Sequence, residues 1–569
     1  MEKIKKTLFF IKNNTYIKLL IIILSIGAIL RFYGLHNAEN TDEYNEVMEA
    51  LRVASGRFNY ERWMKKGFQN LLAVEFGIYF IIGYLINIFS SPVDFAEKVV
   101  RDMEPLFLIG RYTVASMGVA SIALVYMLGK QIYNARVGLI AALFLSVASL
   151  HVWTSHLVNT DVPLTFFFLL SLYFVVKFYS SGKLIDYIVA AFFGAVTINI
   201  KLTGVGIGFI FIVAHIIRCN DQQRSLINYI FCKEILYSFI AFIIGLIISN
   251  PPIVIGLKEF IQYNYAIYAN VYDEIPYAID DNAYFTYLVL LTKEFGIPLF
   301  LLSIASLSYA IYKRESWDYI FIIYLIGIYL ILSSTTFLVQ DRYLMTLIPI
   351  LYLLNARLID SVINKITLLS RQKIISLTIV CVLVLLIPVT NSIVYVRTLT
   401  DENTSKVSKK WIEKNIPAGS NILMDAGRTI ITSGPRLHQS REKLEEKLNI
   451  IRNLKEGETY DSPMVKIVDS YSSIYFELLL KNIPEITYNI TSTELGRKIE
   501  SIEYYKNNGF DYFIHNKALE FRIKDTLWRQ KYPKSAKFYD SIDEEFELIK
   551  IFRPSETRSG STIVIYKIN

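Results

Sequence analysis

The 569-residue chain has little of what a soluble, disulfide-bonded or disordered protein contains. Charged residues make up only 19% of it, below the roughly 25% usual in soluble domains, which excludes a purely soluble enzyme. Its three cysteines, Cys219, Cys232 and Cys381, all precede the polar C-terminal region, so no disulfide scaffold is expected there. Hydrophobic residues make up 53%, an abundance that excludes an intrinsically disordered chain.

Long hydrophobic runs are plentiful instead, and a helix needs about 20 apolar residues to cross a hydrocarbon core. We predict eleven membrane-spanning helices, near 18–34, 106–128, 138–156, 162–180, 184–200, 203–218, 235–256, 295–312, 318–338, 343–359 and 374–396. The first of these lacks a small-residue cleavage site and is predicted to be a retained anchor. A further apolar run, 71–89, contains Glu75, which is costly in lipid. We therefore predict that it is an interfacial or re-entrant helix within an outer loop, 36–105.

The distribution of Lys and Arg predicts which side each loop faces, since cytoplasmic loops carry an excess of both. The N-terminal segment carries five lysines: Lys3, Lys5, Lys6, Lys12 and Lys18. Every loop assigned to the same side is also basic, whereas the loop 257–294 holds two basic and six acidic residues. We therefore predict a multi-pass protein of the plasma membrane with a cytoplasmic N-terminus.

The composition becomes polar after Arg397, and two units are predicted, a transmembrane domain over 1–396 and a second domain over 397–569. In the second, SKKWIEKNIPAGSNILMDAG and IEYYKNNGFDYFIHN each indicate a helix, a glycine turn and a strand, and STIVIYKI indicates a closing strand. Helices alternating with strands predict a small α/β domain. By the count of spans, this domain is extracytoplasmic. The predicted fold class is thus an α-helical polytopic membrane protein with a small C-terminal α/β domain.

Ionisable residues of the membrane half gather near the outer ends of the predicted spans. They are Asp42, Glu43, Arg111, His156, Asp161, Lys201 and Arg342. Carboxylates can accept a proton and cations can hold phosphate charge, so such a group suits chemistry on a lipid-borne phosphate. Simpler roles stay open, because an aspartate can cap a helix and a lysine or arginine can extend from a span end to the interface.

Several segments also resemble a known family when taken together. The segments are NTDEYNEVMEALRVASG, SHLVNTDVPLTFFFLLSLYF, TINIKLTGVGIGF, SNPPIVIGLKEF and QDRYLMTLIPIL. In this order they resemble GT-C glycosyltransferases, in particular the protein O-mannosyltransferase and aminoarabinose-transferase group of glycosyltransferase family 39. The resemblance covers roughly residues 18–360.

The resemblance implies a glycosyltransferase that moves a sugar from a polyprenyl-phosphate donor to an acceptor on the outer side. It implies that Asp42, with Glu43 beside it, is the catalytic base or positions the acceptor, and that Asp161 is the second acidic residue. The lysine and arginine motifs fall on Lys201 and Arg342, and these two cations together with Arg111 are expected to bind the donor phosphate. The candidate accessory residues are Glu75, His156, Lys65 and Lys66.

One motif departs from the family pattern. Aminoarabinose transferases carry a Glu-Lys pair late in the first loop, whereas this chain has Glu75-Phe76. Lys65, Lys66 or Lys201 is then expected to take the place of the missing phosphate-binding lysine.

The predicted reaction is a single displacement with inversion, because one base and no enzyme nucleophile are assigned. The acceptor is a protein, lipid or glycan hydroxyl, and no nucleic acid is involved. A divalent cation, Mg²⁺ or Mn²⁺, on Asp42, Glu43 and Asp161 is compatible with their oxygen ligands but not required by their spacing. Alternative functions are a GT-C oligosaccharide transferase or ligase with a diphosphate-linked donor, a secondary transporter, and a non-catalytic sensor.

Overall fold

The computed structural model describes residues 15–39, 41–55, 66–223, 229–251, 258, 282–334, 339–365, 370–426, 434–453 and 470–568. Lys65, the first four N-terminal lysines and most of the loop 257–294 lie outside the described residues.

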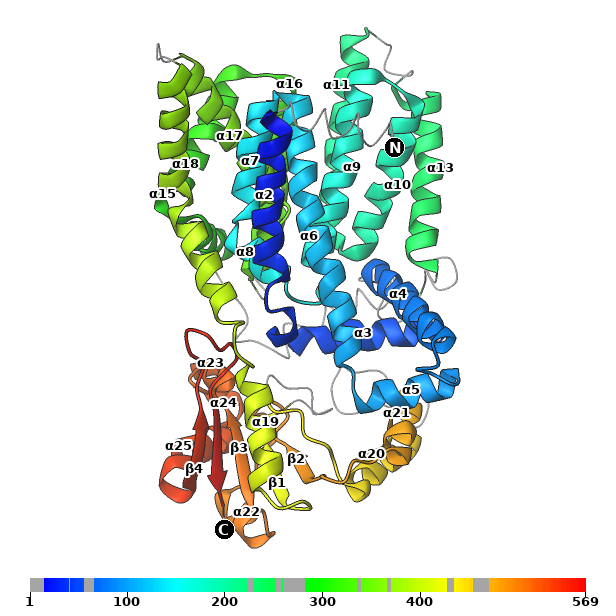
Figure 1. Ribbon diagram of the computed structural model, residues 1–569, viewed down its shortest axis with the longest axis vertical. Helices are drawn as coiled ribbons and strands as arrows, with labels where there is room; N and C mark the ends of the chain where they lie inside the picture. Colours follow the sequence, from blue (N-terminus) through cyan, green and yellow to red (C-terminus); the bar gives the residue numbers. More distant parts are fainter. Residues whose placement is uncertain are drawn as a thin grey trace.

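A bundle of long helices forms one half of the molecule, and a small domain with a β-sheet lies beyond one end of it (Figure 1). The bundle helices are α2 (Thr15–Phe32), α6 (Glu104–Ile132), α7 (Ala135–Ser146), α9 (Asp161–Ser181), α10 (Leu184–Ile200), α11 (Gly206–Asp221), α13 (Lys233–Ser249), α15 (Ala283–Lys313), α16 (Ser316–Ser334), α17 (Leu347–Lys365) and α18 (Ser370–Arg397).

Nine helices of the described residues are long and apolar enough to cross a membrane. Eight of them coincide with predicted spans, and the ninth is α4 (Lys66–Leu85). Three other predicted spans correspond to shorter helices, namely α7 followed by α8 (Ser149–Thr154), α10 and α13. The chain is therefore a multi-pass helical membrane protein, as predicted.

One predicted boundary was wrong. We expected Glu294 in an outer loop, but α15 begins at Ala283, so Glu294 lies within the helix and accepts hydrogen bonds from Ser149 and the Leu150 amide. The helix axis breaks at Gly296, whose φ of 69° is left-handed, two residues before Pro298. Gly296 and Pro298 suggest a helix start in the sequence, but here they mark a kink, and α15 extends on both sides of it from Ala283 to Lys313.

A layer of shorter helices lies across the end of the bundle that faces the small domain (Figure 1). It comprises η1 (Leu35–Asn37), α3 (Thr41–Ala54), α4 and α5 (Pro92–Arg101). The Ser91 hydroxyl caps α5 by accepting from the Asp94 amide. α4 lies obliquely in Figure 1, and Asn70 on it donates to the carbonyl of Ser249 at the end of α13. The interfacial placement of α4 stays a prediction, because the length and composition of α4 would also allow it to cross a membrane.

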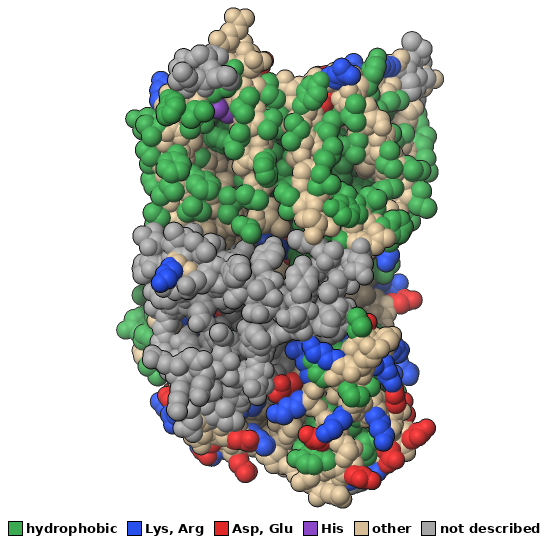
Figure 2. Space-filling model, turned by 180° about the vertical axis from the view of Figure 1, so that it is seen from behind, with side chains coloured by type: hydrophobic (Ala, Val, Ile, Leu, Met, Phe, Trp, Pro, Cys, Tyr) green, Lys and Arg blue, Asp and Glu red, His purple; other side chains and the backbone are tan. Residues whose placement is uncertain are grey.

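Side chains on the bundle surface suit a lipid environment. Large aliphatic residues such as Ile29, Leu236 and Ile379 are more than half exposed. Figure 2 shows hydrophobic side chains over the sides of the bundle, whereas Lys, Arg, Asp and Glu gather on the small domain, with further Lys and Arg at the far end of the bundle. A contiguous apolar surface of this extent requires a membrane or another protein to cover it.

The small domain is built on a five-stranded sheet with the order β2-β1-β3-β5-β4. Its strands are β1 (Asn421–Met424), β2 (Asn489–Ser492), β3 (Tyr512–Asn516), β4 (Glu547–Phe552) and β5 (Ile563–Lys567). β1 is parallel to β2 and β3, while β5 is antiparallel to β3 and β4. The helices and short turns are α19 (Thr404–Asn415), α20 (Arg441–Asn453), α21 (Ser470–Lys481), α22 (Ile502–Asn507), η7 (Lys517–Leu519), α23 (Glu520–Ile523), α24 (Thr526–Lys531) and α25 (Pro533–Glu545). The predicted C-terminal α/β fold is thus confirmed.

Candidate active site

Four of the predicted residues come from four separate elements that meet at the bundle end nearest the small domain. Asp42 lies in the first turn of α3, Asp161 is the first residue of α9, Lys201 directly follows α10, and Arg342 lies in the short helix η6 (Asp341–Leu344). Alternate helix ends of an up-and-down bundle fall on the same face, which explains why residues so distant in sequence share this end.

These four side chains form a continuous row of ion pairs, called the ion-pair row below. Arg342 Nη1 donates to Asp42 Oδ2 at 2.9 Å, and Arg342 Nε lies 3.9 Å from Asp161 Oδ2. Lys201 Nζ donates to the other oxygen, Asp161 Oδ1, at 2.6 Å. The arrangement is therefore a row of alternating charges in which Asp161 lies between the two cations.

Burial differs sharply along the row. The side chain of Asp42 is 49% exposed, whereas that of Asp161 is 2% exposed. Lys201 and Arg342 are intermediate, at 13% and 23%. Asp42 is thus the carboxylate that an incoming molecule can reach, and Asp161 is enclosed behind the cations.

The pKa of Arg342 lies above its ordinary value. Burial opposes the positive charge, but the nearby carboxylates of Asp161 and Asp42 outweigh this penalty. The guanidinium is therefore charged at any physiological pH and is a permanent cation of the site.

Two further residues complete the site and were not singled out from the sequence. The ring of Tyr343 lies 4.5 Å from Lys201 Nζ in a cation–π contact, and Gln340 accepts from Arg342 Nε at 2.5 Å. Both flank Arg342 in the segment QDRYL, so the family-like motif was the available signal.

Glu43 and Arg111 form a pair of their own. Arg111 donates through Nε and Nη2 to the two carboxylate oxygens of Glu43, each at 2.9 Å, and both side chains are fully buried. The Val158 amide donates to the same carboxylate at 2.9 Å, and Arg111 also donates to the carbonyl of Leu35. This bidentate geometry joins α3, α6 and the segment before α9.

The predicted accessory residues lie elsewhere. Glu75 accepts from Thr113 Oγ1 at 2.9 Å, and both ring nitrogens of His156 lie within 3.1 Å of backbone carbonyl oxygens. Lys66 is buried at the start of α4, 3.8 Å from Glu49 of α3. Lys65 lies outside the described residues, and its role stays a prediction.

The carboxylates considered for a divalent cation do not converge. Glu43 is directed at Arg111, while Asp42 and Asp161 each face a cation of the ion-pair row. Among the residues that the structure describes, no group of three or more His, Cys, Asp or Glu side chains is arranged to hold a metal ion. These residues therefore do not fit the metal site that their types allowed.

An apolar groove of about 500 Å³ opens beside the site. It is lined by residues of α3, α4, α9, α10 and α13, among them Val53, Leu71, Phe167, Phe193 and Val196. Val196 precedes Lys201 by five residues, which is about 8 Å of chain along a helix. The groove lining therefore reaches to within about one and a half helical turns of Lys201, which is not itself a lining residue.

The fold and the site together define a polytopic membrane protein with an acid–base and cation cluster at one membrane face, beneath a small α/β domain. A family model described as dolichyl-phosphate-mannose-protein mannosyltransferase matches residues 108–253. This match, over about a quarter of the chain, confirms the family resemblance in the segment that contains Asp161 and Lys201.

Two solved structures are similar in overall arrangement. One is the oligosaccharyltransferase AglB from Archaeoglobus fulgidus in complex with an inhibitory peptide and a dolichol-phosphate, at 11% identity and a TM-score of 0.49, covering 97% of this chain and 74% of that chain. The other is ArnT from Cupriavidus metallidurans bound to undecaprenyl phosphate, at 11% identity and a TM-score of 0.49, covering 97% of both chains. No curated protein sequence matches the chain.

Proposed function

We propose that the protein is an inverting membrane glycosyltransferase, which moves one sugar from a polyprenyl-phosphate donor to an acceptor hydroxyl. The observation that carries this proposal is the ion-pair row Asp42–Arg342–Asp161–Lys201, in which the half-exposed carboxylate of Asp42 contacts Arg342 and the enclosed carboxylate of Asp161 joins Arg342 to a second cation, Lys201. The family match over residues 108–253 supports the same class of reaction.

Asp42 is the general base of the proposed reaction. It is the half-exposed carboxylate of the row, and its place in the first turn of α3 sets it near the helix N-terminus, where a negative charge is stabilised. Its bond to Arg342 orients the carboxylate, and about half of the side chain is exposed toward an incoming acceptor. The proton of the acceptor hydroxyl passes to Asp42 as the oxygen attacks the anomeric carbon.

Lys201 and Arg342 hold the leaving phosphate. The bond between the anomeric carbon and the phosphate oxygen breaks as the new glycosidic bond forms, and its electron pair stays on polyprenyl phosphate. Both cations stabilise the charge that develops there. Because attack and departure occur on opposite faces in a single step, the configuration at the anomeric carbon is inverted.

Asp161 is a positioning residue in this scheme rather than a second base. Its carboxylate is enclosed and lies between Lys201 and Arg342, so it keeps two like charges close together without a phosphate present. We assign Glu43 and Arg111 a related role, because their buried bidentate pair fixes the first turn of α3 on α6.

The prenyl tail of the donor has a matching surface in the apolar groove between α4, α9, α10 and α13. A chain lying in that groove would bring its phosphate toward Lys201. The site and the small domain lie at the same end of the bundle (Figure 1), and the distribution of Lys and Arg supports an extracytoplasmic location for both.

The test supplies purified protein in liposomes with radiolabelled polyprenyl-phosphate sugars and a membrane extract, and identifies the labelled product. Asp42→Asn should lower the transfer rate by about 10²–10⁴-fold, the usual contribution of a general base. Glu97→Gln, on α5 of the same layer, is the matched control and should transfer at the wild-type rate. Wild-type transfer by Asp42→Asn, or transport of the sugar lipid without any product, would refute the proposal.

A further inference from the structure

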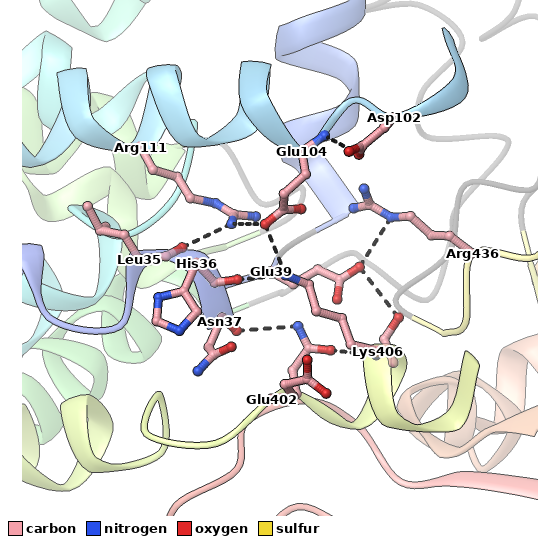
Figure 3. A network of polar contacts seen from close by, with 12 residues as sticks. Leu35, His36, Asn37, Glu39, Asp102, Glu104, Arg111, Glu402, Lys406 and Arg436 are labelled. Atoms are coloured by element: carbon pink, nitrogen blue, oxygen red, sulfur yellow. Dashed lines mark hydrogen bonds and ion pairs between the residues drawn. The ribbon is translucent and has the colours of Figure 1, made fainter. Parts of the chain in front are cut away.

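A second cavity, of about 280 Å³, lies between the helical layer and the small domain. Its bundle side includes Glu39, Tyr44 of α3 and Arg111 of α6, and its domain side includes Lys406 and Arg436. Figure 3 shows these charged side chains converging from the two halves of the molecule. The cavity is separate from the apolar groove, because the two have no lining residue in common.

Two acidic residues on the bundle side are paired with basic residues on the domain side. Lys406 Nζ donates to Glu104 Oε1 at 2.9 Å, and Arg436 Nε lies 3.2 Å from Glu39 Oε1. Arg111 Nη1 lies 3.6 Å from the same Glu104 oxygen. The contacts of Lys406 and Arg436 hold the small domain on the bundle. The cavity lies between the two surfaces that these contacts join.

The domain side of the cavity instead presents polar groups whose bonding is incomplete. Gln439 is only 8% exposed, yet neither its Oε1 nor its Nε2 has a hydrogen-bond partner among the described residues. Lys447 of α20 also lines the cavity and forms no salt bridge within the described part of the chain. Buried polar groups are normally satisfied, so an unpaired amide at a cavity wall indicates a missing partner.

The charge balance of the lining indicates the sign of that partner. Six basic residues line the cavity against three acidic ones: Arg101, Arg111, Lys406, Lys409, Arg436 and Lys447 against Glu39, Asp102 and Glu104. The wall also contains apolar side chains, including Phe107, Leu444 and Leu479. A ligand with one negative group and a short carbon skeleton matches both features.

We propose that this cavity is a binding site for a small organic anion, whose negative group is held by Lys447 and Gln439 and whose carbon skeleton lies against Leu444 and Leu479. The anionic group belongs either to the acceptor or to a free metabolite. In both cases it binds next to the catalytic helix, because Tyr44 lies two residues after Asp42 and Arg111 holds Glu43.

Binding is measured on the purified full-length protein without any transfer reaction, so the result does not depend on the proposed function. The probes are inorganic phosphate, glycerol 3-phosphate and butyrate, each titrated at constant ionic strength against chloride, with the melting temperature and calorimetric heat as readouts. We expect at least one organic probe to bind more tightly than chloride and inorganic phosphate. Equal, non-saturating responses to all four anions would overturn the proposal.

Two variants link binding to the cavity. Lys447→Met and Gln439→Leu should each weaken binding of the effective probe at least tenfold. Gln439→Leu should also keep or raise the melting temperature without anion, because it removes a buried amide that lacks a partner. Lys443→Met is the control on the same helix, where Lys443 pairs with Glu446 instead. Unchanged binding by both cavity variants would overturn the assignment.

The transfer assay then separates the two sources of the anion. If the acceptor carries it, Lys447→Met raises the acceptor KM, and the free probe competes with the acceptor. If a free metabolite supplies it, the probe changes the transfer rate without changing the acceptor KM. Failure of transfer altogether would count against the proposed function and leave the binding result standing.

Discussion

At the scale of single residues, adjacent acids have opposite surroundings. Asp42 is half-exposed beside Arg342, while Glu43 is fully buried on Arg111. The difference follows from α-helical geometry, because consecutive residues point about 100° apart and cannot face the same space. One acid is therefore available for chemistry, and its neighbour serves to anchor the helix.

Glu43→Gln tests this anchoring role. A buried ion pair that loses one partner leaves an uncompensated charge, which typically costs 3–5 kcal/mol. We expect Glu43→Gln to lower the melting temperature of the purified protein and its yield, whereas Asp42→Asn should leave both near wild type. The double variant Glu43→Gln/Arg111→Met should recover part of the loss. A melting temperature for Glu43→Gln equal to that of wild type would show that the pair is not structural.

At the scale of elements, the outer layer of helices sets the geometry of the site. α3 brings Asp42 to Arg342 and Tyr44 to the second cavity, while α4 covers α3 and borders the apolar groove. We predict that α4 stays on one membrane face, although its length and composition would allow it to cross.

Cysteine labelling at both ends of α4 distinguishes these two placements. In a background without Cys219, Cys232 and Cys381, we introduce Ser55→Cys before α4 or Ser90→Cys after it, both at exposed positions. A membrane-impermeant maleimide should label both from the same side of intact vesicles. Arg314→Cys, between α15 and α16 at the other end of the bundle, should react from the opposite side. Labelling of positions 55 and 90 from opposite sides would show that α4 spans the membrane.

At the scale of the whole molecule, the small domain and the helical layer form a continuous interface. The pairs Lys406–Glu104 and Arg436–Glu39 connect them, and the cavity between them borders α3. Buried charges and polar groups make such an interface sensitive to protonation.

The surroundings of His438, at this interface, predict how the stability of the protein changes with pH. Burial, with a contribution from the charge of Lys409, lowers the pKa of His438 to about 4. The unfolded chain, with a histidine pKa near 6.5, binds a proton first as the pH falls, so stability declines between about pH 6.5 and 4. His438→Gln should make the melting temperature fall less steeply over this window, whereas His36→Gln, at an exposed histidine, should not. An unchanged slope in His438→Gln would show that this histidine is not responsible.

Much of this arrangement was predictable from the sequence. Apolar runs identified the spans because membrane thickness sets the length of a crossing helix. Successive helices of the bundle run in opposite directions, which explains why Asp42, Asp161, Lys201 and Arg342 share one end. The pairing of Glu43 with Arg111 was not predictable, because local spacing gives no measure of burial or of partners distant along the chain.

The sequence by itself determined the class of fold, the end of the bundle that carries the charges and the residue types available for chemistry. Only the tertiary structure decided which carboxylate is exposed, which cations flank Asp161 and where a second cavity forms. The physical reason is that hydrophobicity and helical periodicity are local properties, readable along the chain. Exposure and ion pairing instead depend on how side chains from separate helices pack against each other, as Glu43 and Asp42 illustrate.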